Sequence, residues 1–286
     1  MLPDVLSVIL RALGWLAIVQ AGGAAMFLAL FGDGIDAARR PILRLTRIAA
    51  LAAIVLLVAQ YLLEPARMTA SLTGVFDSEL QRFLLHTRAA KVLALRLAGV
   101  ALLLWALRRD GAGLRRYGLA GAILIAASFP LTGHSAESPE RWLLMPLLGL
   151  HLLVVEFWFG ALLPLIWVSE RDAASRAAST VESFSRLAGW VVPLIFLAGL
   201  VIALRLLPDF GAVRTPYGAG LLLKALAFSV LLGLAAMNKW RFGPALAGGS
   251  RQAALRLRQS IYIEFVLIGL VVMGTATLTT FWSPLG

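Results

Sequence analysis

The residues that could bind a metal ion or carry a proton are few in this sequence, and most of them share one stretch. The candidates are His86, His134, Met145, His151 and Glu156. All but the first lie within residues 131–164, the chain has no other histidine, and it has no cysteine. Imidazole and thioether groups suit copper, with thioether favouring Cu(I), whereas Ca²⁺ and Mg²⁺ need clusters of oxygen ligands. The residue types therefore favour copper, as Cu(I) or Cu(II).

The elements that must position these residues are membrane-spanning helices. The sequence is 60% hydrophobic and 14% charged, and apolar runs of roughly 20 residues, enough to cross a bilayer as a helix, recur along it. We expect an all-α, polytopic membrane protein with a single transmembrane domain over residues 1–286. Eight spans are predicted, at Val5–Phe31, Ile48–Leu63, Ala89–Leu107, Tyr117–Leu131, Trp142–Val168, Ala188–Leu207, Gly218–Asn238 and Ile261–Phe281.

The distribution of Lys and Arg predicts the orientation. The first, third, fifth and seventh connections carry most of these residues, so the positive-inside rule places them in the cytoplasm and both termini outside. The net charge of +11 follows from this pattern, which favours a lipid bilayer as the partner and excludes nucleic acid. The two longest connections are Glu64–Arg88 outside, with a short amphipathic piece from Leu72 to Leu84, and Ser169–Leu187 inside.

The predicted topology places every histidine in the outer half of the protein. At 1.5 Å per residue, His151 lies about 13 Å and Glu156 about 20 Å below the outer end of the fifth span. His86, His134 and Met145 lie nearer the surface. We expect these three residues and His151 to form a metal site open to the periplasmic side. The alternatives are that His151 is a structural hydrogen-bonding group and that Met145 fills a gap in apolar packing.

Further polar residues within the spans have two interpretations each. Glu156 does not share a helix face with His151, so it is either a proton or cation relay or the partner of a buried cation, with Arg96 as the candidate. Lys224 is either an interfacial anchor or an ion-pair partner for Asp209 or Glu64. We expect Asn238 and Glu264 to hydrogen-bond to each other across the seventh and eighth spans.

A haem or redox protein is the alternative function. Haem iron usually takes two axial ligands, and His151 has no second histidine at its depth, whereas His134 and His86 at the rim remain a candidate pair. The chain has no P-loop, GxSxG or HExxH motif. These observations favour a transporter over an enzyme and copper over haem.

Several segments carry a family resemblance. They are TGHS at Thr132–Ser135, HLLVVEFWFGALLP at His151–Pro164, LLLKALAFSVLLGLAAMNKWRFGP at Leu221–Pro244 and IYIEFVLIGLVVMGTATLT at Ile261–Thr279. In order and spacing they resemble the CopD/PcoD family of inner-membrane copper-resistance proteins. The likeness spans nearly the whole chain and is strongest from Thr132 onward.

The resemblance implies an eight-helix protein of the bacterial inner membrane with both termini periplasmic and a role in copper transport or tolerance. His134 and His151 match the family's histidines, and Lys224, Asn238 and Glu264 match its other polar positions. Glu156 departs from the pattern, which has a small or apolar residue there. Some relatives carry a fused CopC-like copper-binding domain, which we do not find in this sequence, so the resemblance implies that any partner of that kind is a separate periplasmic protein.

Overall fold

The described part of the chain is entirely helical. The computed structural model describes residues 2–206 and 216–281, and its regular structure within these ranges consists of helices alone. The long helices are α1 (Leu2–Phe31), α2 (Arg39–Met68), α4 (Arg88–Ala106), α5 (Gly111–Ser128), α7 (Arg141–Arg171), α8 (Ala174–Leu206), α9 (Pro216–Met237) and α11 (Arg251–Phe281). The short ones are η1 (Gly32–Gly34), η2 (Leu72–Phe76), α3 (Ser78–Leu85), η3 (Phe129–Leu131), α6 (His134–Glu137), the π-helical turn η5 (Asn238–Phe242) and α10 (Gly243–Ala247).

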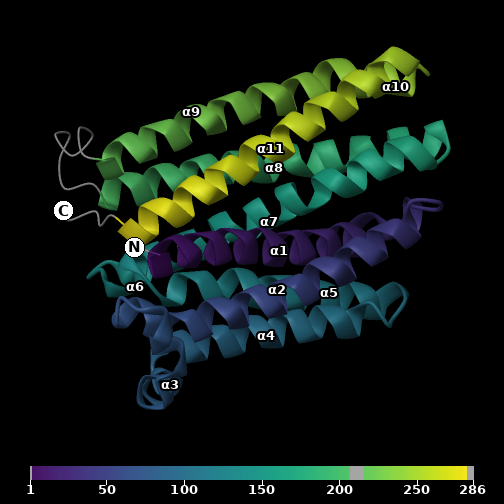
Figure 1. Ribbon diagram of the computed structural model, residues 1–286. Coiled ribbons are helices and arrows are strands. Elements are labelled where there is room, and N and C mark those ends of the chain that lie inside the picture. The colour runs from purple at the N-terminus through teal and green to yellow at the C-terminus, as the bar shows by residue number, and fades with distance from the viewer. Residues whose placement is uncertain (1, 207–215, 282–286) are drawn as a thin grey trace.

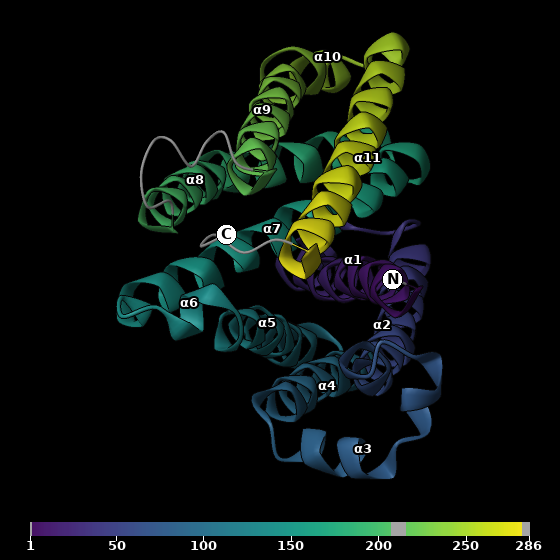
Figure 2. The same cartoon turned by 60° about the vertical axis from the view of Figure 1, so that its left-hand side comes forward.

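The long helices form an elongated bundle with α1 and α7 at its centre (Figures 1 and 2). α1 packs against α2, α5, α7 and α11, and α7 packs against α1, α5, α8 and α11. α3 lies at one edge of the bundle, and α9 and α10 lie at the opposite edge. The two ends of the described chain lie at the same end of the bundle, which we call the terminal end.

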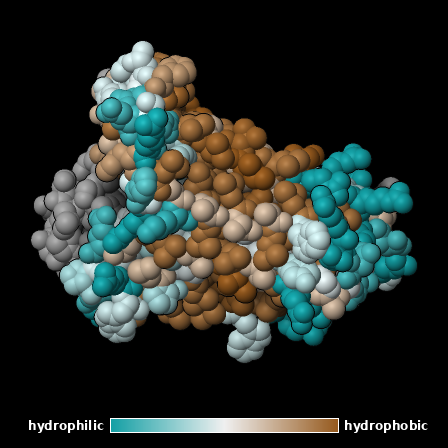
Figure 3. Space-filling model, turned by 90° about the horizontal axis from the view of Figure 1, so that it is seen from below, coloured by the Kyte–Doolittle hydropathy of each residue, from teal (hydrophilic) through white to brown (hydrophobic). Residues whose placement is uncertain are grey.

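The surface has the character of a membrane protein. Figure 3 shows a broad apolar band between hydrophilic residues at the two ends of the bundle. Seven helices in the described ranges are long and apolar enough to cross a membrane: α1, α2, α4, α7, α8, α9 and α11. The protein is therefore a multi-pass membrane protein. Helix α5 is not among the seven; it has 18 residues and carries Arg115 and Arg116 near its start, so the count of eight spans and the periplasmic termini stay predictions.

The predicted spans coincide with helices, but the helices are longer. The connection predicted at Ser169–Leu187 is wrong as a loop, because α7 continues to Arg171 and α8 begins at Ala174. Hydropathy detects only the apolar part of each helix, whereas these polar ends continue as helix and find partners. Arg176 pairs with Asp36 at 2.7 Å, and Arg258 pairs with Glu170 at 3.1 Å.

The amphipathic piece predicted from Leu72 to Leu84 is present as η2 and α3. Asp77 caps α3, because its Oδ1 accepts hydrogen bonds from the main-chain N–H groups of Glu79 and Leu80, both at 3.0 Å. Leu84 is buried while Phe76 and Phe83 are exposed. An apolar surface of this kind at the bundle edge suits a short helix lying at a membrane interface.

Ionic contacts hold the terminal end together. Arg67 on α2 pairs with Glu64 at 3.0 Å and with Asp4 of α1 at 3.4 Å. Arg11 on α1 lies 3.9 Å from Glu64 and donates to Thr280 Oγ1 of α11 at 2.9 Å. The first, second and last helices are thereby tied to one another.

Candidate functional site

The ring of His151 is fixed by a hydrogen bond to the neighbouring helix α8. Its Nδ1–H donates to the carbonyl oxygen of Ile195 on α8 at 3.3 Å. A carbonyl only accepts, so Nδ1 carries the proton and Nε2 keeps a free lone pair. Gly199, one turn further along α8, lies beside the ring, and a Cβ there would lie 3.5 Å from His151 Cε1, an ordinary contact. Metal-binding histidines are commonly fixed by such a bond from their other nitrogen.

The other predicted metal ligands lie apart from His151. His86 follows α3, is exposed, and donates from Nδ1 to the carbonyl of Arg82 at 3.0 Å. Because α3 packs against α4 and α2 at one edge of the bundle (Figure 2), whereas α7 packs against α1, α5, α8 and α11, the structure does not bring His86 and His151 together. Met145 is half-buried on α7, and six residues place it about 120° around the helix from His151.

His134 begins α6, which packs against η3 and α7 at the terminal end. Its side chain lies outside the described part of the structure. Within the described residues, no group of three or more His, Asp or Glu side chains is placed to hold a metal ion. Among the described residues, His86, Met145 and His151 are therefore not part of a preformed metal cluster, and a site that includes His134 stays a prediction.

A buried polar centre joins α7, the π-helical turn η5 and α11. Glu264 is 2% exposed and accepts hydrogen bonds from Asn238 Nδ2 at 2.5 Å and from Trp158 Nε1 at 3.2 Å. The hydrogen bond predicted between Asn238 and Glu264 is present. The sequence does not predict Trp158 as the second donor, because a tryptophan within an apolar run is expected to pack against other apolar side chains. Asn238 begins the π-helical turn, a feature frequent at functional sites.

Aromatic rings connect this centre to the helices around His151. Phe228 of α9 meets Trp158 edge-on, with ring centroids 6.2 Å apart, and stacks on Phe196 of α8 at 6.1 Å. Ile195, the hydrogen-bond partner of His151, directly precedes Phe196. A continuous set of contacts therefore runs from His151 between α7, α8 and α9 to Glu264.

Lys224 lies one turn before Phe228 on α9 and is half-buried. The predicted pair with Glu64 is wrong, because Glu64 is bonded to Arg67 and Arg11 on the other side of the molecule. The other predicted partner, Asp209, lies outside the described residues. The interfacial anchor and the pair with Asp209 both stay predictions for Lys224.

Glu156 faces α1. It is 1% exposed, and its carboxyl group lies against Gly22, so that a Cβ at that glycine would overlap Oε1. Gly23 makes an equally close approach to the main chain of Glu156 and to Gly160. Gln20 completes this contact by donating from Nε2 to the carbonyl of Gly160 at 3.0 Å.

The predicted pair of Glu156 with Arg96 is wrong. Arg96 on α4 donates from Nε to Ser128 Oγ at 3.1 Å, and its guanidinium lies 4.3 Å from the ring centroid of Phe129. The reason is the order of helices, since α7 packs against α1 and α5 rather than α4. Within the described residues, Oε1 of Glu156 has no hydrogen-bond partner.

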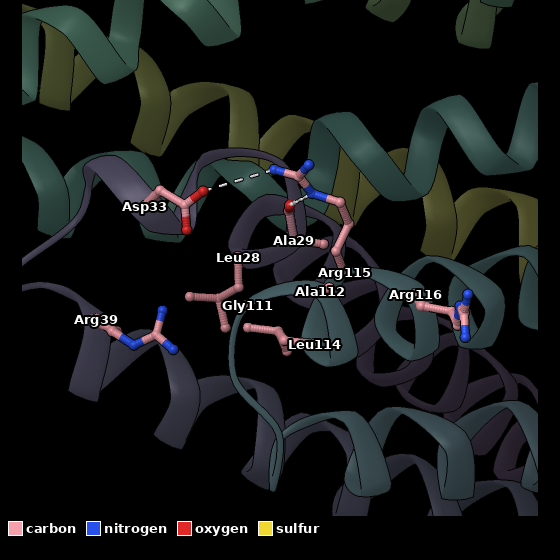
Figure 4. Close-up of a pocket in the computed structure, with 9 residues that line it drawn as sticks. All are labelled: Leu28, Ala29, Asp33, Arg39, Gly111, Ala112, Leu114, Arg115 and Arg116. Carbon is pink, nitrogen blue, oxygen red and sulfur yellow. Dashed lines mark hydrogen bonds and ion pairs between the residues drawn. The ribbon is translucent and has the colours of Figure 1, made fainter.

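A pocket of about 300 Å³ lies at the other end of the bundle, between the end of α1, the start of α2 and the start of α5 (Figure 4). Two of its three basic residues are already engaged. Arg115 donates to the carbonyl of Ala29 at 3.0 Å and lies 3.8 Å from Asp33, and Arg39 pairs with Asp110 at 3.0 Å. This pocket holds none of the residues predicted to bind a metal, and its contacts join three helix ends.

Comparison with known proteins decides the family. The family model for the N-terminal domain of copper resistance protein D-like proteins matches residues 1–141, and the model for copper resistance protein D matches residues 178–278. The chain belongs to the copper resistance protein D family. This confirms the resemblance found in the sequence. Helix α7, which carries His151, Glu156 and Trp158, lies between the two matched regions.

A curated relative shares the description. Copper resistance protein D of Pseudomonas syringae pv. tomato is 30% identical over 189 residues, covering 59% of this chain and 61% of the relative. The match thus spans less than two thirds of the relative's length. No solved structure matches the chain.

Proposed function

We propose that this protein is an inner-membrane copper transport or tolerance protein that takes up copper from the periplasmic side. Family membership supports the copper role. The observation that carries the site is the bond from His151 Nδ1–H to Ile195, which leaves Nε2 as a lone-pair donor inside a membrane helix.

Copper passes along α7 in steps in this proposal. His134 of α6 and Met145 at the start of α7 form the rim, and His151 accepts the ion one to two turns deeper. The ion then moves between α7, α9 and α11, past Trp158 and the two residues that it contacts, Phe228 and Glu264. A separate CopC-like periplasmic protein is the proposed copper donor or acceptor.

Copper binding by the purified protein tests the site. We expect His134→Ala and His151→Ala each to lower the copper bound per chain. His86→Ala should leave it unchanged, because His86 follows α3 and lies apart from His151. Met145→Leu should weaken Cu(I) binding more than Cu(II), because thioether sulfur favours the softer ion. Unchanged copper content in both His134→Ala and His151→Ala would rule out the proposed ligands.

Transport has to be separated from binding. Sealed vesicles that contain the protein should move copper across the membrane, and His151→Ala should abolish this movement while His86→Ala retains it. Copper that binds but does not cross would reduce the protein to a scaffold for its periplasmic partner. A Soret band in the purified protein would instead support the haem-binding alternative.

A further inference from the structure

Glu156 combines complete burial with an oxygen that lacks a hydrogen-bond donor. Its side chain is 1% exposed, and within the described residues Oε1 has no partner. An ionised carboxylate without a partner is strongly disfavoured at membrane depth, whereas the neutral acid is tolerated far better. The surroundings therefore select the protonated form.

The side-chain oxygen of Gln20, at the same contact between α1 and α7, also lacks a hydrogen-bond donor within the described residues. Gln20 uses its Nε2 to donate to Gly160, one turn after Glu156, and within the described residues its Oε1 has no donor. A protonated carboxyl carries an O–H group, which is the kind of donor missing from this contact. Gly22 and Gly23 bring α1 close enough to exclude water from it.

Six ionisable groups on the helices of this bundle are engaged elsewhere. Their partners are Thr280 for Arg11, Ser128 for Arg96, the Ala29 carbonyl for Arg115, the Ile195 carbonyl for His151, Arg186 for Glu182, and Trp158 and Asn238 for Glu264. Among the described residues none of these groups is bonded to Glu156, so none compensates a negative charge on it.

We propose that Glu156 is a proton-binding site and that its bound proton holds α7 against α1. Loss of that proton to water leaves a carboxylate that must be hydrated, so release of the proton accompanies separation of the two helices. Since α7 connects the two regions that match the family models, this movement shifts the first half of the chain relative to the second. The proposal stands independently of copper transport.

Infrared spectroscopy of the purified protein in lipid nanodiscs tests the protonation state directly. At neutral pH we expect a carboxylic-acid C=O stretching band that is present in the wild type and lost in Glu156→Gln. Glu264→Gln is the matched control, because Glu264 is also buried but has two donors, and it should leave the Glu156 band in place. A wild-type spectrum without a band that disappears in Glu156→Gln would overturn the proposal.

Helix separation requires a second measurement. The chain has no cysteine, so spin labels can be attached at Val5→Cys on α1 and Trp142→Cys on α7, both exposed positions near the terminal end. We expect the distance between the labels to increase at alkaline pH in the wild type and in Glu264→Gln, and to stay constant in Glu156→Gln. A distance that does not depend on pH, or that changes equally in Glu156→Gln, would refute the coupling of the proton to this contact.

Discussion

The carboxyl group of Glu156 on α7 lies against the main chain of Gly22 on α1. Any side chain at position 22 would occupy the space of Oε1. The neighbouring Gly23 serves a different purpose, because it faces the main chain of Glu156 and Gly160. Two adjacent glycines therefore accommodate two different parts of the same helix.

This difference gives a test with an internal control. We expect Gly22→Ala to destabilise the protein by about 1–3 kcal/mol through overpacking, and Glu156→Ala to remove that penalty in the double variant. Gly23→Ala should be at least as damaging and should not be rescued by Glu156→Ala, because its clash is with main chain. Thermal unfolding of the detergent-purified variants checks both. Equal rescue of both glycine variants would contradict the described contact.

The bonds to Glu264 predict energetic coupling. Trp158→Phe keeps an aromatic ring against Phe228 but removes a donor to a buried carboxyl, so it should cost about 1–3 kcal/mol of unfolding free energy. In a Glu264→Leu background the same substitution should cost much less, since the acceptor is gone. A double-mutant cycle measures this difference. Additive costs would show that Trp158 contributes packing alone.

The position of Gly199 beside His151 predicts a size limit. An added Cβ at Gly199 lies 3.5 Å from His151 Cε1 and 3.7 Å from Nδ1, which is ordinary contact. Gly199→Ala should therefore preserve copper binding, while Gly199→Leu should displace the ring and reduce copper binding to the level of His151→Ala. Copper content of the purified variants decides this. Full copper content in the Gly199→Leu protein would show that His151 does not bind the copper.

The orientation of the bundle can be measured with single cysteines at exposed positions. If both termini are periplasmic and α5 crosses the membrane, Glu79→Cys and Glu137→Cys react with a membrane-impermeant maleimide applied to intact spheroplasts, and Arg108→Cys does not. All three should react after the membrane is opened. Labelling of Arg108→Cys together with Glu137→Cys in intact spheroplasts would show that α5 does not span.

The sequence predicts the helices well because apolar length is a local property. Each predicted span coincides with a helix, and the amphipathic piece before His86 is present as η2 and α3. Helix ends were placed less well, since the polar residues of α7 and α8 extend both helices across a predicted loop.

Side-chain partners could be predicted only in part, because they depend on which helices are neighbours. Asn238 and Glu264 lie on helices joined by a short turn, so their hydrogen bond follows from proximity along the chain. Arg96 is the candidate cation that the sequence offers for Glu156, but Glu156 on α7 faces α1, and no pattern in the sequence specifies that neighbour. The separation of His86 from His151 is likewise a consequence of helix order.

The bond between Gln20 and Gly160 joins residues that are 140 positions apart. During synthesis α1 enters the membrane long before α7 exists, so the amide of Gln20 meets its acceptor only when the chain has grown past residue 160. Every earlier biosynthetic intermediate therefore lacks the native acceptor for this amide. The N-terminal half therefore completes its own interior only after a helix from beyond it has been inserted.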